Sequence, residues 1–114
     1  MITERIKILQ GAGLISETSA GFAENTACIL MDRFQDRSES VEGFITHLAM
    51  AVQRILNNEM VDQVDDAIWE EVKNSDQCKD ATDLLNQILK GAPCEIPENE
   101  RCFLIIHLCN IVNS

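Results

Sequence analysis

The sequence predicts an all-α protein, a compact bundle of about five helices. Apolar residues recur at helical spacing in five segments, and no segment shows sustained strand-like alternation. Aromatic residues, which strands favour, are scarce: the chain holds four Phe, one Trp and no Tyr. A chain of 114 residues has the length of about one domain and buries roughly two-thirds of the surface that its unfolded form exposes.

The first half of the chain holds two of these predicted helices. Residues 1–9 show only a weak helical pattern that ends near Gly11 and Gly13, so we expect residues 1–15 to be an N-terminal extension and residues 16–114 to be the helical domain. A helix is predicted over residues 16–34, where one face carries Phe22, Thr26, Ile29, Leu30 and Phe34. The polar stretch 35–40 is expected to break it.

The helix over residues 41–58 has the clearest apolar stripe, and Ser40 is expected as its N-cap. Its stripe follows the spacing i, i+4, i+7, i+8, i+11 at Phe44, Leu48, Ala51, Val52 and Ile55. A short helix is predicted over residues 64–72, with Ile68, Trp69 and Val72 facing the core.

The remaining two helices flank a loop that contains both prolines. Residues 77–90 form a predicted helix that Ser75 or Asp76 caps and Gly91 follows. The last helix is expected to begin near Pro97, which suits a first helical position. Its interior, residues 102–109, is apolar on nearly every side, a pattern that predicts burial at the centre of the domain.

Charge and cysteine content exclude several kinds of partner. The net charge is −10, and residues 59–100 carry twelve acidic side chains against three basic ones. Such a surface repels phosphate backbones and anionic lipids, so we expect no direct nucleic-acid binding and no membrane binding. Five cysteines without a Cys-x-x-Cys pair, no signal peptide and no apolar run of about 20 residues predict a reduced, cytoplasmic protein.

The residues that could carry chemistry are the only two histidines, His47 and His107, each within a predicted helix. Arg54 follows His47 by seven residues and Glu100 precedes His107 by seven, so each shares a helical face with its histidine. Histidine titrates near neutral pH and can act as a nitrogen nucleophile. Two structural histidines within the core or at its boundary are the alternative that spacing alone leaves open.

Two segments resemble the histidine motifs of PTS regulation domains (PRDs). Residues 43–54, GFITHLAMAVQR, resemble the first motif, in which Arg follows His by seven residues. Residues 97–108, PENERCFLIIHL, resemble the second, with a proline, an acidic residue, an apolar stretch and His. The histidines lie 60 residues apart, a separation that also fits the family, and the resemblance covers about residues 16–112.

The resemblance implies a five-helix regulatory domain of bacterial sugar-operon transcription regulators, with two antiparallel helix pairs and a short helix across them. It implies His107 and His47 as phosphoacceptors, with Arg54 and Glu100 as their supporting residues. The implied phosphate donors are the phosphocarrier protein HPr or sugar-permease components of the phosphotransferase system, and the resemblance also allows a homodimer. Thr46 stands where the family usually has Asp before the first histidine, so we expect His107 to be the principal phosphoacceptor.

Three other functions compete with this hypothesis. Cys94, Cys102, His107 and Cys109 suggest zinc, but a five-residue separation points Cys102 and His107 about 140° apart on one helix, so no metal is expected. An enzyme would need a phosphate loop or an activated nucleophile, and neither is present, so no catalytic residue and no cofactor are expected. A protein-interaction module with an unphosphorylated, degenerate site is the third alternative.

Overall fold

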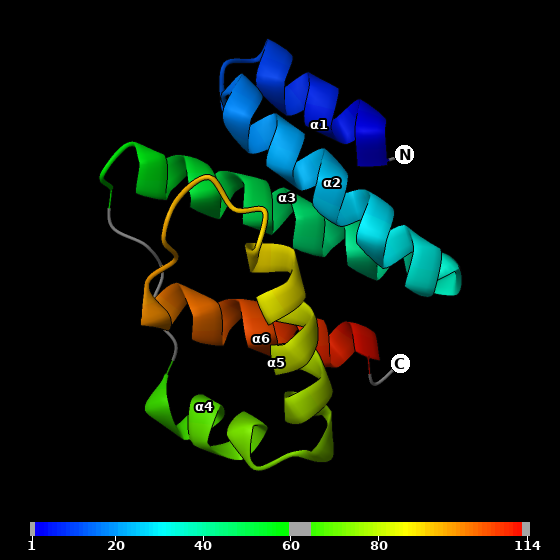
Figure 1. Ribbon diagram of the computed structural model, residues 1–114, viewed down its shortest axis with the longest axis vertical. Helices are drawn as coiled ribbons and strands as arrows, with labels where there is room; N and C mark the ends of the chain where they lie inside the picture. The colour runs from blue at the N-terminus through cyan, green and yellow to red at the C-terminus, as the bar shows by residue number, and fades with distance from the viewer. Residues whose placement is uncertain (1, 60–64, 113–114) are drawn as a thin grey trace.

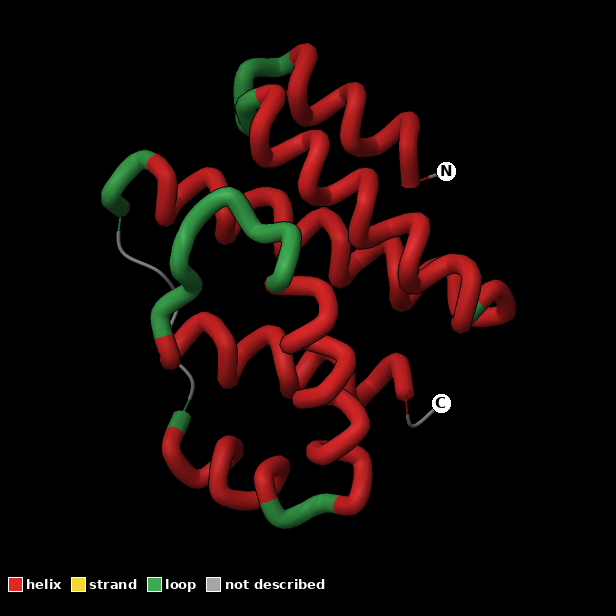
Figure 2. Tube along the Cα trace, in the orientation of Figure 1, coloured by secondary structure: helices red, strands yellow, loops and turns green. Residues whose placement is uncertain are grey.

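The computed structural model describes residues 2–59 and 65–112, and every regular element in these two ranges is helical. In chain order the elements are α1 (Ile2–Gly11), α2 (Glu17–Arg33), the 3₁₀ turn η1 (Gln35–Arg37), α3 (Ser38–Leu56), α4 (Asp66–Lys73), α5 (Asp76–Leu89) and α6 (Glu98–Val112). Figure 1 follows them along the chain, and Figure 2 shows the described loops, of which the one between α5 and α6 is long. The all-α prediction is confirmed, with six α-helices in the described ranges where five and a marginal sixth were expected.

Capping side chains mark the start of two helices, α2 and α4. The hydroxyl of Ser16 accepts a hydrogen bond from the Ser19 amide at the start of α2, and the carboxylate of Asp65 accepts one from the Ala67 amide at the start of α4. The predicted cap at Ser40 is wrong, because Ser40 lies inside α3. The break predicted over residues 35–40 is shorter in the structure. The 3₁₀ turn η1 takes up only residues 35–37, and α3 begins at Ser38 with no side-chain cap.

The helices form two groups that meet where α3 contacts α6. Helices α2 and α3 pack against each other and α1 covers part of both, while α5 packs on α6 and α4 touches both of these. Figure 1 shows the first group above the second. Between the groups, the Arg37 guanidinium donates hydrogen bonds to the carbonyls of Ile111 and Val112, which fastens η1 to the C-terminal end of α6.

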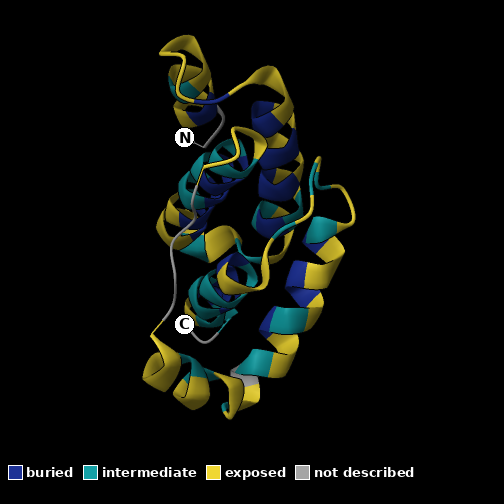
Figure 3. Cartoon of the chain, turned by 90° about the vertical axis from the view of Figure 1, so that its left-hand side faces the viewer, coloured by how far each residue is buried: buried dark blue, intermediate teal, exposed yellow. Residues whose placement is uncertain are grey.

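The core consists of aliphatic side chains and two phenylalanines from all helices except α4. Its largest fully buried apolar members are Ile6, Leu30, Val41, Phe44, Ile45, Leu48, Val52, Leu85, Leu104, Leu108 and Ile111. Figure 3 shows the buried positions along the inward sides of the helices. No residue of α4 is buried, and Ile68 is 51% exposed, so the prediction that it faces the core is wrong. A two-turn helix at the edge of the bundle covers its neighbours with one narrow side only, which carries Trp69.

Helix α6 lies against α3, α4 and α5, although it is not buried on every side as its composition suggested. Leu104, Ile105, Leu108 and Ile111 are buried, whereas the residues between them are partly or fully exposed. No helix in the described ranges is both long and apolar enough to cross a membrane.

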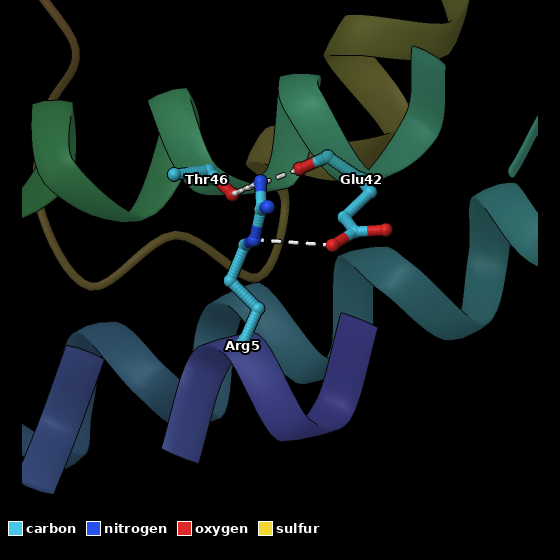
Figure 4. A network of polar contacts seen from close by, with 3 residues as sticks. All are labelled: Arg5, Glu42 and Thr46. Carbon is cyan, nitrogen blue, oxygen red and sulfur yellow. Dashed lines mark hydrogen bonds and ion pairs between the residues drawn. The ribbon is translucent and has the colours of Figure 1, made fainter. Parts of the chain in front are cut away.

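Helix α1, in the segment predicted to be an extension, packs on α2 and α3. Ile6 is 1% exposed within the common core. Figure 4 shows Arg5 reaching α3, where its Nε lies 3.0 Å from a carboxylate oxygen of Glu42 and its Nη1 is 3.5 Å from the Thr46 hydroxyl. Thr46 in turn donates to the Glu42 carbonyl. The division of the chain at residue 15 stays a prediction, and α1 lies against the α3 turn that precedes His47.

Candidate functional site

The candidate site lies where α3 and α6 meet. On α3, His47 borders the apolar stripe whose members Phe44, Leu48 and Ala51 are buried, so its side chain is mostly covered and 19% exposed. On α6, Glu100, Phe103 and His107 follow the spacing i, i+3 and i+7, which places all three on one helix face. The contact between the two helices brings this face against His47.

Three rings pack together at this contact and form what we call the ring cluster: His47, Phe103 and His107. The centroids of His47 and Phe103 are 4.4 Å apart, with 18° between the ring planes. The two histidine rings are 5.2 Å apart at 24°, and Phe103 is 4.7 Å from His107. The structure therefore brings together two histidines that are 60 residues apart in the sequence.

Glu100 binds His47, the histidine of the other helix. Its Oε1 lies 2.9 Å from Nε2 of His47, and its side chain is fully buried. A carboxylate can only accept, so Nε2 carries the proton and donates, which leaves Nδ1 with the lone pair when the ring is neutral. Seven residues span about 10 Å of helix axis, so Glu100 bonds to the histidine of the partner helix and acts on His107 through its charge alone. Its supporting role stays a prediction.

The second oxygen of Glu100 has a different environment. Oε2 is buried and accepts no hydrogen bond from any described residue. A buried polar atom without a partner is costly and is uncommon in folded proteins. The carboxylate therefore has unused capacity to accept a hydrogen bond beside the ring cluster.

His107 is held by packing, because no hydrogen bond to its ring occurs within the described residues. Burial lowers the pKa of His107, the nearby His47 lowers it further, and the Glu100 carboxylate opposes both with a smaller effect. The neutral ring, which has one nitrogen lone pair, is consequently favoured at neutral pH. This is the form that a nitrogen nucleophile requires.

Two further residues complete the comparison with the sequence. Arg54 lies half-buried on α3, two turns beyond His47 and about 10 Å along the helix axis, so its supporting role stays a prediction. Phe103 was not predicted as a site residue, although it contacts both histidines. The signal was its position four residues before His107, since residues i and i+4 are neighbours on a helix surface.

The cysteines form no disulfide, and the surroundings of three of them disfavour the reactive thiolate. All five are free; Cys28 is exposed and the other four are partly buried. Burial raises the pKa of the Cys94, Cys102 and Cys109 thiols, which favours the protonated form over the thiolate that binds metal. Among the described residues, no group of three or more His, Cys, Asp or Glu side chains is arranged to hold a metal ion.

Comparison with known proteins gives one match. The family model described as the PRD domain matches residues 24–111, a range that contains both histidines and all helices from most of α2 to α6. No curated protein and no solved structure matches the chain.

Proposed function

This chain belongs to the PRD domain family of regulatory domains, which the phosphotransferase system controls, and we propose that it senses the state of that system through phosphorylation of His107. The observation that carries the proposal is the ring cluster, in which the histidines of the two family motifs stack at 5.2 Å. Domains of this family regulate and do not catalyse. The acceptor histidine is therefore a modification site that reports on the supply of phosphoryl groups.

The geometry favours His107 over His47 as the acceptor. Nε2 of His47 already donates to Glu100, and the buried carboxylate repels an incoming phosphoryl group. The ring of His107 has no such contact in the described part of the chain, and its lowered pKa favours the neutral, nucleophilic form. His47 is then a secondary acceptor or a silent one.

The proposed phosphoryl donors are HPr or a sugar-permease component of the phosphotransferase system, acting in the cytoplasm. Phosphorylation adds about two negative charges at the contact between α3 and α6. Because this contact joins the two helix groups, the added charge alters how they pack and so changes the surface offered to another protein. A second copy of this chain is one such partner.

The test is labelling with phosphoenolpyruvate, enzyme I and HPr, followed by intact-mass measurement under alkaline conditions that preserve phosphohistidine. We expect wild-type protein to gain acid-labile phosphate, His107→Gln to lose most of it, and His47→Gln to keep most of it. Circular dichroism and thermal melting of each variant control for loss of the fold. A folded His107→Gln variant that is labelled as fully as wild type refutes the site assignment.

One alternative has a specific observation in its favour. Thr46 replaces the Asp that usually precedes the first histidine, and Glu100 holds that histidine in a buried pair. A protein-interaction module that keeps the fold without phosphorylation has no need for a reactive His47. Folded wild-type protein that takes up no phosphate from any of these donors favours this alternative.

A further inference from the structure

The ring cluster places both histidines within the range of a single phosphoryl group's charge. Their centroids are 5.2 Å apart, and Phe103 packs against both, so neither ring can turn away without breaking aromatic contacts. Phosphoryl groups on both rings would each carry about two negative charges. At the dielectric constant of water, the repulsion of two such groups about 8 Å apart already reduces the equilibrium constant for a second transfer about 30-fold.

Glu100 makes the two histidines unequal. It is fully buried, it lies 2.9 Å from Nε2 of His47, and its second oxygen has no hydrogen-bond donor among the described residues. Bulk water therefore screens its charge poorly. Phosphorylation of His47 at Nε2 requires this pair to break, and phosphorylation at Nδ1 leaves the new charge on the same small ring.

We propose that the ring cluster is one phosphorylation site that accepts a single phosphoryl group at a time, and that buried Glu100 directs this group to His107. This inference rests on the proposed function and adds two properties to it, the stoichiometry and the residue that selects the acceptor. Glu100 is a positioning residue in this scheme, because it acts on the choice of acceptor through His47 and bonds to no reacting atom.

The transfer step is balanced without a further reactant. The lone pair of the unprotonated nitrogen of His107 attacks the phosphorus of the donor's phosphohistidine. The donor's N–P bond breaks, and its electron pair stays on the donor ring. Nothing is oxidised or reduced. One proton passes through solvent from the other nitrogen of His107 to the donor ring, so both rings end neutral and the transferred phosphoryl group keeps its roughly two negative charges.

The effect of the Glu100 charge on the phosphorylation of His47 is large enough to measure. Removing one negative charge about 5 Å from a phosphoryl group of charge −2 relieves a repulsion equivalent to at least about tenfold, even at the dielectric constant of water. Glu100→Gln removes the charge and keeps an oxygen that accepts from Nε2 of His47. The variant thus separates the effect of charge from that of the hydrogen bond.

The experiment compares phosphate stoichiometry and acceptor identity after labelling by phosphorylated HPr. We expect wild type to saturate at one phosphoryl group on His107. In a His107→Gln background, adding Glu100→Gln is expected to raise the initial rate of His47 labelling at least about tenfold. Glu98→Gln in the same background is the matched control, since it removes one charge from the exposed first turn of α6 and should change the rate less than twofold.

The possible results distinguish a failure of this inference from a failure of the proposed function on which it rests. Two phosphoryl groups on wild type, or equal rates with and without Glu100→Gln, overturn the inference and leave the proposed function intact. No labelling of any folded variant overturns both. Thermal melts show whether the double variants fold. If a double variant does not fold, the Glu100→Gln single variant is labelled instead, and the fraction of its label that lies on His47 is measured.

Discussion

The pair between His47 and Glu100 predicts an unequal response to losing either partner. Replacing His47 with Phe keeps a ring that can stack on Phe103 but removes the one donor that the described residues offer to a fully buried carboxylate. A hydrogen bond to a charged group contributes about 1.5–3 kcal/mol. We therefore expect His47→Phe to lower the free energy of unfolding by about 2 kcal/mol at pH 7.

Losing the carboxylate should be far less costly. The side chain of His47 is 19% exposed, so its Nε2 can find water when Glu100 is gone. Replacing a buried ionic group with an apolar one of similar volume is often neutral or stabilising. Glu100→Leu is expected to change stability by less than about 1 kcal/mol, and the double variant should match Glu100→Leu because no buried charge is left unpaired.

Urea unfolding of the wild type, both single variants and the double variant measures this as a double-mutant cycle. The expected coupling is about 2 kcal/mol, within the range found for contacting residues. Single effects that add to within about 0.5 kcal/mol in the double variant would show that His47 and Glu100 do not interact. The slope of each unfolding curve is compared as well, since a changed slope indicates an altered unfolded or native state.

Three further predictions follow from the core, the titration of His107 and the charge. Ile6→Ala removes three buried carbons and should lower the free energy of unfolding by about 2–4 kcal/mol in the same urea assay. Ile8→Ala is the control, because Ile8 lies on the same helix but is 69% exposed, and its effect should be less than about 0.5 kcal/mol. Equal effects of the two substitutions would show that α1 does not pack on the core. The pKa of His107 is lowered in the folded state, so stability should fall as the pH drops below about 6.5, where the unfolded chain takes up a proton that the folded chain does not; this part of the pH dependence should disappear in His107→Gln. With a net charge of −10, the protein should show no binding to RNA or DNA at physiological salt in an anisotropy titration, and a complex that weakens steeply with added salt would contradict this.

The sequence predicts the single helices better than any other part of the fold. The stripe that begins at Phe44 and the apolar pattern around Leu104 predicted α3 and α6, because burial on a helix repeats every 3.6 residues and the pattern is local. The two histidines were recognised for a similar reason, since each occupies a fixed offset from Arg54 or Glu100 within one helix. The weak pattern at the N-terminus was underestimated, because α1 contributes Ile6 to a core whose other members lie on α2 and α3.

The order of amino acids is enough to predict a helical bundle with one histidine on α3 and one on α6. Three relations depend on how the helices pack: Glu100 pairs with His47, Phe103 contacts both histidines, and α1 lies over the helix of the first histidine. The physical reason is that periodicity gives the direction of a side chain around its own helix axis and no information on how far the facing helix is shifted or rotated. Between residues 47 and 100 that relation is set by how the cores of α3 and α6 pack, since close packing permits only a few arrangements of two facing helices.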